Sequence, residues 1–239
     1  MPAEACKAGV ARRTWFGRGI PGLIGAAALL AALAATAYAA VDIYSNGFGS
    51  RQAFREIKSA GGGKGCEKAW NKKHDQIRIE LKRAPGDCTY TPPVQGDGPK
   101  PDHRFAAKGK ISKGTNKNIR EGAYLTVSVR VGGGKRYELR VFPKGQEYVL
   151  RRQPNAVGFP ATGTNPDIGK IGKRNALVLT ANGNELRAKV NGTTLDTITD
   201  TNANEITGVK LQFGIGSEAD SKRNTIGTFT SLVVSVPNP

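Results

Sequence analysis

The sequence predicts an all-β protein, an antiparallel β-sandwich that follows an N-terminal signal or transmembrane helix. Two observations beyond residue 40 support this prediction. Apolar and polar residues alternate with a period of two in most segments, and turn residues recur about every ten positions. This spacing is too short for βαβ units, and the one helical candidate is the short stretch 66–73. We therefore expect one domain over residues 41–239, preceded by residues 1–40.

The first 40 residues contain the three parts of a secretory signal peptide. Basic residues, including Arg12 and Arg13, precede an apolar run over 19–41 that contains the cleavage-type sequence Ala37-Tyr38-Ala39. The run is also long enough to span a bilayer, with its basic end in the cytoplasm, so cleavage and retention as an anchor both stay open. Paired arginines leave Sec and twin-arginine export open as well. We expect a domain that is secreted or anchored on the outer face of the cytoplasmic membrane.

Two cysteines remain after the signal segment, Cys66 and Cys88. In an oxidising compartment such an even pair predicts a disulfide, which would stabilise the fold by about 3 kcal/mol in the chain-entropy model. Neither a CxxC spacing nor a nearby pair of histidines favours a metal site instead.

The basic charge is concentrated in one half of the chain. The net charge is +17, and removal of residues 1–39 would leave +14. Residues 40–153 hold 24 Lys and Arg against 11 Asp and Glu, whereas residues 154–239 hold 8 against 7. The basic half would suit an acidic polysaccharide, a wall polymer, a phospholipid surface or extracellular nucleic acid, although solubility alone accounts for the same surplus. No motif for specific nucleic-acid recognition is present in the sequence.

The predicted strands follow one another with short connections. They cover residues 76–84, 123–131, 136–143, 146–153, 175–183, 185–192, 209–216 and 227–236. The Gly-rich stretch 132–135 predicts a hairpin. Asn-Gly pairs at 182–183 and 191–192 predict type I′ turns around a strand whose inward residues are Leu186, Ala188 and Val190.

The order of these segments over residues 120–239, and NALVLTANGNELRAKVNGTTLDT above all, resembles a known family. It is similar to the concanavalin A-like, laminin-G-like jelly roll of secreted lectin, glucanase-like and 3-keto-disaccharide hydrolase-type domains, and the likeness extends loosely back to Asp42. Glucanase relatives carry catalytic carboxylates in an E-x-D-x-x-E stretch, which this sequence lacks. The family's catalytic residues therefore have no counterpart here, and we expect no enzyme.

Candidate ligand-binding residues are the arginine and aromatic side chains that the alternation places outward on one sheet face. They are Arg130, Arg140, Phe142, Arg151 and Arg152. Such side chains suit sugar stacking and the recognition of carboxylate or phosphate groups. An ordinary solvated sheet face would show the same residue types.

A calcium site is a second candidate, because oxygen-bearing side chains alternate at Asp200, Asn202 and Asn204. Laminin-G-type jelly rolls often hold calcium at their rim. Glu205 replaces the glycine of an EF-hand loop, so that motif is excluded, and Asx-turn chemistry is the alternative. No other cofactor is expected.

Together these features predict non-catalytic binding of an extracellular carbohydrate or anionic wall polymer. The alternatives are a glycoside-acting hydrolase of the jelly-roll class and a structural interaction module on the cell surface.

Overall fold

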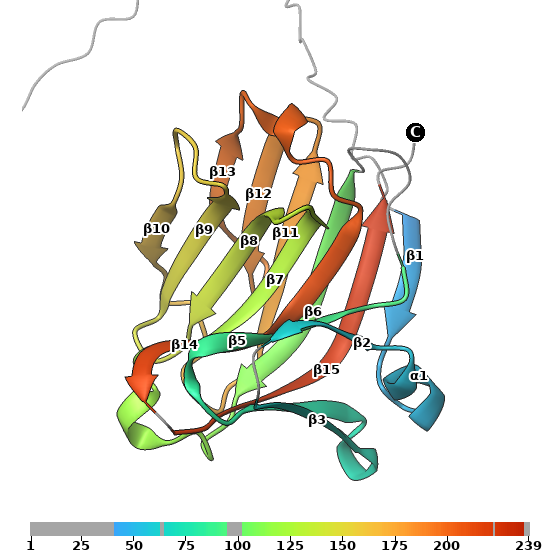
Figure 1. Ribbon diagram of the computed structural model, residues 1–239, viewed down its shortest axis with the longest axis vertical. Coiled ribbons are helices and arrows are strands. Elements are labelled where there is room, and N and C mark those ends of the chain that lie inside the picture. Colours follow the sequence, from blue (N-terminus) through green and yellow to red (C-terminus); the bar gives the residue numbers. More distant parts are fainter. Residues whose placement is uncertain (1–40, 63–64, 95–101, 222, 237–239) are drawn as a thin grey trace, which may run out of the picture. The chain divides into compact units, whose positions relative to one another are not determined.

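The computed structural model describes residues 41–62, 65–94, 102–221 and 223–236 (Figure 1). The signal or transmembrane segment predicted over residues 1–40 lies outside them. In the described ranges, no helix combines the length and the apolar character needed to cross a membrane.

Two antiparallel sheets pack face to face, as the alternation predicts (Figure 1). Sheet A has the order β13-β12-β11-β6-β15-β4-β3, with β1 also paired to β15. Its strands are β1 (Val41–Asn46), β3 (Cys66–Asn71), β4 (Gln76–Leu81), β6 (His103–Ile111), β11 (Asn175–Asn182), β12 (Glu185–Val190), β13 (Thr193–Thr199) and β15 (Thr225–Val236). Sheet B has the order β10-β9-β8-β7-β14-β5-β2. Its strands are β2 (Lys58–Gly62), β5 (Ala84–Thr91), β7 (Ala123–Gly132), β8 (Lys135–Phe142), β9 (Glu147–Gln153), β10 (Ala161–Thr164) and β14 (Lys210–Ser221).

Helices in the described residues are short. They are α1 (Arg51–Arg55), which Ser50 caps, and the 3-10 turns η1 (Lys72–His74), η2 (Lys117–Ile119) and η3 (Ala203–Glu205). The helix expected over 66–73 is wrong for most of its length, because Cys66–Asn71 pairs with β4 as a strand. Only its last residues adopt a helical turn.

The core lies between the sheets and follows the period-two pattern. In β8, Tyr137, Leu139 and Val141 are fully buried, while the residues between them face the other side of the sheet. Phe213 of sheet B meets Phe229 of sheet A edge to face, with ring centroids 5.0 Å apart. Burial of one such ring stabilises the fold by about 1.5–3 kcal/mol.

The two Asn-Gly turns differ from each other. Asn191 and Gly192 both have positive φ, at 50° and 93°, as a type I′ turn requires. Asn182, in contrast, still pairs with Glu185 in the ladder, so that the loop begins at Gly183, which has a φ of 54°. The predicted inward residues Leu186, Ala188 and Val190 are all buried, which confirms the register.

The predicted disulfide is confirmed. Cys66 of β3 and Cys88 of β5 are bonded, with their Cα atoms 5.5 Å apart. Because β3 belongs to sheet A and β5 to sheet B, the bond joins the two layers.

Candidate functional site

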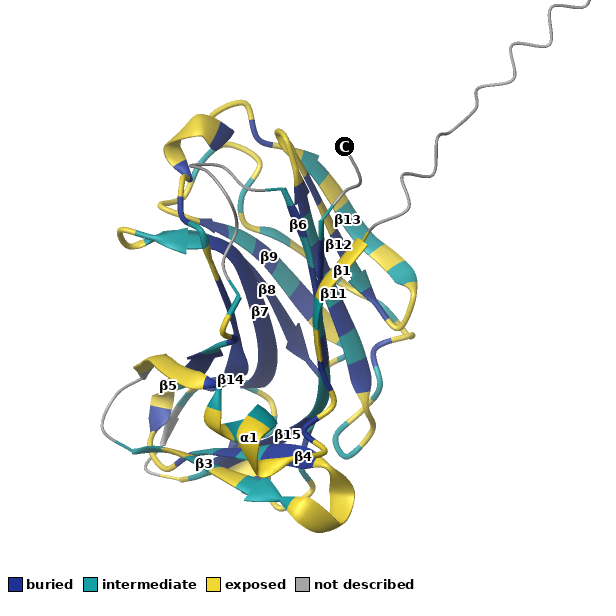
Figure 2. Cartoon of the chain, turned by 90° about the vertical axis from the view of Figure 1, so that its right-hand side faces the viewer, coloured by how far each residue is buried: buried dark blue, intermediate teal, exposed yellow. Residues whose placement is uncertain are grey.

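Sheet B is bent, and its outer face lies on the concave side of the bend, as the side view of the backbone shows (Figure 2). Cross-strand pairs place its polar side chains in rows. One row runs from Gln212 on β14 through Ser128 on β7 and Glu138 on β8 to Arg151 on β9. These residues lie far apart in the sequence and meet only because β7 pairs with both β8 and β14. We call this surface the concave face.

Four charged side chains at the centre of the concave face form what we call the concave cluster: Arg136, Glu138, Arg140 and Arg151. Glu138 is 1% exposed and lies 2.8 Å from Nε of Arg151 and 3.2 Å from Nε of Arg140. An Nη atom of Arg136 lies 3.5 Å from Oε2 of Glu138, the same oxygen that faces Arg151. The hydroxyl of Thr126 also donates to Glu138, at 3.0 Å. One buried carboxylate therefore orients three guanidinium groups.

Electrostatics keep this carboxylate ionised. Burial alone would raise the pKa of Glu138, but the attraction of Arg140, Arg136 and Arg151 and the Thr126 hydrogen bond outweigh burial and lower it below its ordinary value. Glu138 is consequently an anchor for arginines at neutral pH and lacks the proton that a general acid would need.

An aromatic floor adjoins the cluster. The rings of Tyr124 and Phe142 lie 5.3 Å apart, and the guanidinium of Arg140 sits 4.3 Å above the Tyr124 ring. Tyr124 covers Gly216, where an added Cβ would come within 2.2 Å of the ring. Glycine at 216 is thus what lets the tyrosine lie flat against the strand.

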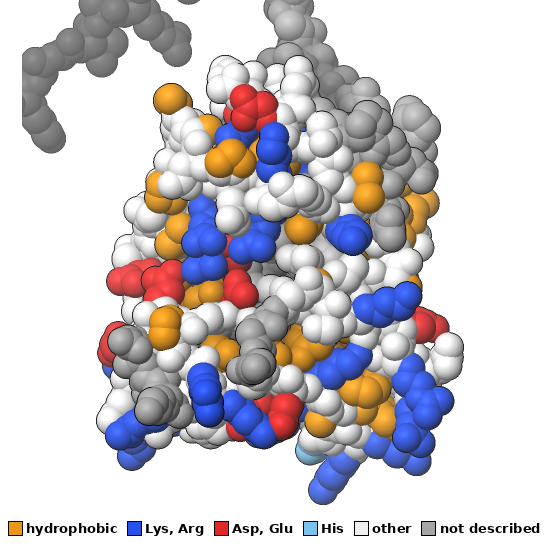
Figure 3. Space-filling model, in the orientation of Figure 1, with side chains coloured by type: hydrophobic (Ala, Val, Ile, Leu, Met, Phe, Trp, Pro, Cys, Tyr) orange, Lys and Arg blue, Asp and Glu red, His pale blue; other side chains and the backbone are white. Residues whose placement is uncertain are grey.

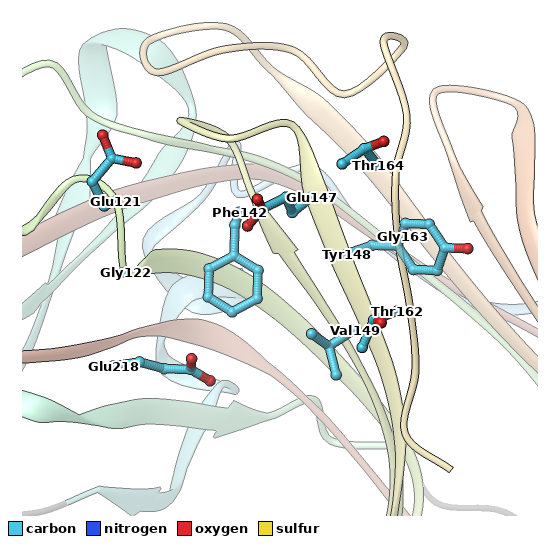
Figure 4. Close-up of a pocket in the computed structure, with 10 residues that line it drawn as sticks. All are labelled: Glu121, Gly122, Phe142, Glu147, Tyr148, Val149, Thr162, Gly163, Thr164 and Glu218. Atoms are coloured by element: carbon cyan, nitrogen blue, oxygen red, sulfur yellow. The ribbon is translucent and has the colours of Figure 1, made fainter. Parts of the chain in front are cut away.

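The described residues of this face line a pocket near each end of β8, and we name the two pockets by their charge. The acidic pocket, of about 440 Å³, is lined by Glu121, Glu147 and Glu218 around the Phe142 ring (Figure 4). Two of the three acids have cationic neighbours: Glu218 pairs with Arg140 at 2.9 Å and Glu121 with Lys144 at 3.4 Å.

The basic pocket, of about 550 Å³, lies at the other end of β8. Four cations line it: Lys58, Lys135, Arg136 and Lys210. Its remaining lining residues include Gln212, Pro92 and the glycines of the β7–β8 hairpin, and none of the described ones is acidic. Figure 3 looks onto the concave face and shows acidic and basic side chains intermixed over β8 and β9.

The structure brings together three of the five predicted binding residues. Arg140, Phe142 and Arg151 lie on the concave face. The expectation that Arg130 shares this face is wrong, because its side chain is fully buried and contacts Asp102 at 2.9 Å. An irregular register after Val129 and a positive φ of 53° at Arg130 interrupt the alternation there.

Arg152 is the second correction. Adjacent strand residues face opposite sides, so Arg152 points inward when Arg151 points outward. It is 2% exposed, and it pairs with Asp200 at 2.8 Å and Glu205 at 2.6 Å. The hydroxyl of Tyr137 donates to the same Asp200 oxygen at 2.6 Å. We call these four side chains the inner cluster.

The segment predicted to bind calcium belongs to this inner cluster. One oxygen of Asp200 faces Arg152, and the other accepts from the backbone N–H of Asn202 at 2.9 Å, which is an Asx turn. Calcium binding by Asp200, Asn202 and Asn204 stays a prediction. In the described part of the chain, no group of three His, Cys, Asp or Glu residues is arranged to hold a metal ion.

Several site residues were not identified from the sequence. Glu138 alternates in step with Arg140 in RYELRVF, so the same period places it on the concave face. The lysines of the basic pocket come from β2, β8 and β14, and no local pattern links them.

No protein-family model and no curated protein matches the sequence. Solved structures do match the fold. A protein of unknown function with a galectin-like fold from Bacillus subtilis aligns with a TM-score of 0.59 and 11% identity, over 83% of this chain and 98% of that one. The CBM2 module of the evolved Dit protein of Lactobacillus casei BL23 phage J-1 gives 0.58 and 10%, over 84% and 97%.

The Crh5 transglycosylase in complex with NAG aligns with a TM-score of 0.57 and 10% identity, over 82% of this chain and 84% of that chain. Identities this low show the fold alone, and a shared fold hosts many functions. The described domain is therefore a jelly roll of the concanavalin A-like, galectin-like type.

Proposed function

We propose that this protein is an exported, non-catalytic carbohydrate-binding module whose ligand lies along the concave face of sheet B. The observation that carries the proposal is the concave cluster, in which Glu138 holds three guanidinium groups in fixed orientations at the centre of a hollowed sheet. Guanidinium N–H groups donate to sugar hydroxyls and to carboxylates. Donors that are already oriented lose less entropy when a ligand binds.

The shape of the face supports a chain-like ligand. Arg136 lines the basic pocket and Phe142 lines the acidic pocket, and these residues are six positions apart on β8, a span of about 20 Å at about 3.3 Å per residue. A hollow of this length fits an extended oligosaccharide. Structures of the same fold include a carbohydrate-binding module and a transglycosylase in complex with NAG, in agreement with this class of ligand.

The proposal is tested by measuring retention of the full chain on a glycan array and on cell-wall preparations. The decisive variant is Arg151→Ala, which removes the most exposed guanidinium of the concave cluster, 30% exposed. Its matched control is Arg187→Ala on sheet A, where Arg187 pairs with Glu185 at 3.0 Å. We expect Arg151→Ala to weaken binding about tenfold, the worth of one charge-assisted hydrogen bond, and the control to leave it unchanged. Absence of retention on every glycan, or equal losses in both variants, would rule the proposal out.

The acidic pocket favours one second candidate, a glycoside hydrolase. Glu147 and Glu218 come from different strands and line the same pocket beside Phe142 (Figure 4). Glycoside hydrolysis commonly uses two carboxylates on either side of the scissile bond. Release of reducing sugar by the wild-type chain, lost in Glu147→Gln and Glu218→Gln, would establish the hydrolase. Undiminished binding with no release would support the binding module.

A further inference from the structure

We infer that the basic pocket holds an acidic sugar unit, one that carries an anionic group and at least one free hydroxyl. This inference rests on the proposed function and names the class of glycan that the concave face selects. Three features of the pocket carry it: its charge, two unpartnered hydrogen-bonding atoms, and its distance from the acidic pocket.

The charge of the pocket calls for an anion. Lys58, Lys135 and Lys210 line it together with Arg136, and among described residues no acid lies within ion-pair distance of the three lysines. Cations that gather in a hollow reinforce one another's potential and raise the local concentration of anions. An anionic group on the ligand would neutralise a surplus that the described chain leaves unbalanced.

Hydrogen bonding narrows the ligand further. Gln212 is 7% exposed and lines the pocket, and its amide oxygen has no hydrogen-bond partner among the described residues. Nε of Arg136, in the same lining, is likewise unpartnered there. Both atoms are buried beneath the pocket lining, and buried polar atoms are normally paired, so we infer that a bound ligand pairs with them once the two side chains turn toward it.

A simple anion satisfies only half of this requirement. A fully ionised anion such as sulfate can accept from Arg136, but it has no hydrogen to offer the oxygen of Gln212. A sugar unit with a carboxylate, sulfate or phosphate ester supplies the acceptor, and its hydroxyl supplies the donor. The combination therefore points to an acidic saccharide in preference to a fully ionised inorganic anion.

The placement of the pocket gives the bound chain a direction. The other end of the concave face holds the carboxylates of Glu121, Glu147 and Glu218 around Phe142, which lies six positions from Arg136 on β8. Like charges repel, so an acidic sugar unit is disfavoured at that end. The acidic unit is bound next to the β7–β8 hairpin, with neutral units toward β10.

The test is titration calorimetry on the full chain with matched pairs of probes. The acidic probes are hexamers of galacturonate, glucuronate and mannuronate, and the neutral probes are the same hexamers after reduction of their carboxyl groups. A glycerol phosphate oligomer is a separate arm that tells a phosphate source from a carboxylate. We expect an acidic probe to bind at least about tenfold more tightly than its neutral counterpart, with a difference that shrinks as salt is added.

Three variants of residues that line the basic pocket test whether the preference for the acidic probe arises there. Lys135→Gln and Lys210→Gln should each lower the affinity for the acidic probe about tenfold and leave the neutral probe unchanged. Gln212→Leu should weaken both probes, because the hydroxyl that it accepts from is present in each. Lys189→Gln on β12 of sheet A is the matched control and should change nothing.

The outcomes separate this inference from the proposed function. Equal affinity for acidic and neutral probes, or an equal loss in the Lys189→Gln control, overturns the inference and leaves glycan binding standing. If the lysine variants lose affinity but Gln212→Leu does not, the pocket binds the negative charge alone. That result would also overturn the inference of an acidic sugar unit. If no probe binds, acidic or neutral, the result contradicts both the inference of an acidic sugar unit and the proposed glycan-binding function.

Discussion

Arg151 and Arg152 are neighbours in β9, yet they enter two clusters of opposite character. Arg151 joins the concave cluster, where three arginines share Glu138, and remains 30% exposed. Arg152 joins the inner cluster, where it is 2% exposed and faces two acids, Asp200 and Glu205. The inner cluster surrounds a buried arginine, whereas the concave cluster keeps arginine N–H groups on an open face, where Glu218 and Asp87 also pair with Arg140. From this contrast we expect the inner cluster to serve stability and the concave cluster to serve the proposed binding.

The largest expected effect comes from Arg152→Met. Removal of one partner from a buried ion pair leaves the carboxylate of Asp200 without its cation, and such changes cost about 3–5 kcal/mol. We expect chemical denaturation to show a loss of this size, while glycan affinity of the folded fraction stays at the wild-type level. A loss under 1 kcal/mol would show that the inner cluster does not hold the β9 and η3 segments together.

Glu138→Gln should have the next largest effect. It leaves three guanidinium groups without their shared carboxylate, and we expect a cost of about 1.5–3 kcal/mol at neutral pH. It should also weaken glycan binding, since the guanidinium groups lose their orientation.

The effect of Glu138→Gln should depend on pH in one direction. The pKa of Glu138 in the folded protein lies below its ordinary value of 4.5, so its stabilisation is complete above that value and is lost as the pH falls through the folded pKa. Denaturation curves should therefore differ between wild type and variant at pH 7 and converge in acid. A gap that stays constant down to pH 2 would contradict the role given to Glu138.

Gly216→Ala probes the aromatic floor. The new methyl group would lie within 2.2 Å of the Tyr124 ring, which must move away from Arg140. Overpacking of this kind costs about 1–2 kcal/mol. Thermal melts should show the loss of stability, and tyrosine fluorescence should report the displaced ring.

The control is Gly133→Ala, in the open hairpin where no atom lies within 4 Å, and it tests the cost of a methyl group without a collision. Because Gly133 has a φ of 56°, any loss there reports backbone strain alone.

The smallest effect on stability should come from Arg151→Ala. Partly exposed ion pairs contribute under about 1 kcal/mol, and Glu138 keeps Arg136 and Arg140. Arg151→Ala should instead weaken glycan binding. Arg152→Met is expected to do the opposite, lowering stability while leaving the affinity unchanged. The paired measurement of stability and affinity for these adjacent arginines is the sharpest check on the division between the two clusters. If both variants changed stability and glycan affinity by the same amounts, the two clusters would not have separate roles.

Local sequence patterns identified many of the strands, but they missed β5 and β6, predicted a helix where β3 lies, and did not place every side chain. Alternation in RYELRVF correctly separates buried Tyr137, Leu139 and Val141 from the concave face. The same rule applied to Arg130 fails, because the chain leaves regular strand geometry between Val129 and Gly132. A shift of this kind depends on the neighbouring strand, which is not visible in a local pattern.

Sequence alone determined the sandwich architecture, the Cys66–Cys88 bond and the outward position of Arg140, Phe142 and Arg151. These depend on a period of two and on residue chemistry, which act over a few neighbouring positions. Only the tertiary structure decided which distant strands lie side by side. Pairing of β7 with β14 sets Gln212 opposite Ser128, and the curvature of sheet B gathers lysines from β2, β8 and β14 around one pocket. Long-range pairing is governed by the whole core, so the concave face and its pockets were decided only by the tertiary structure.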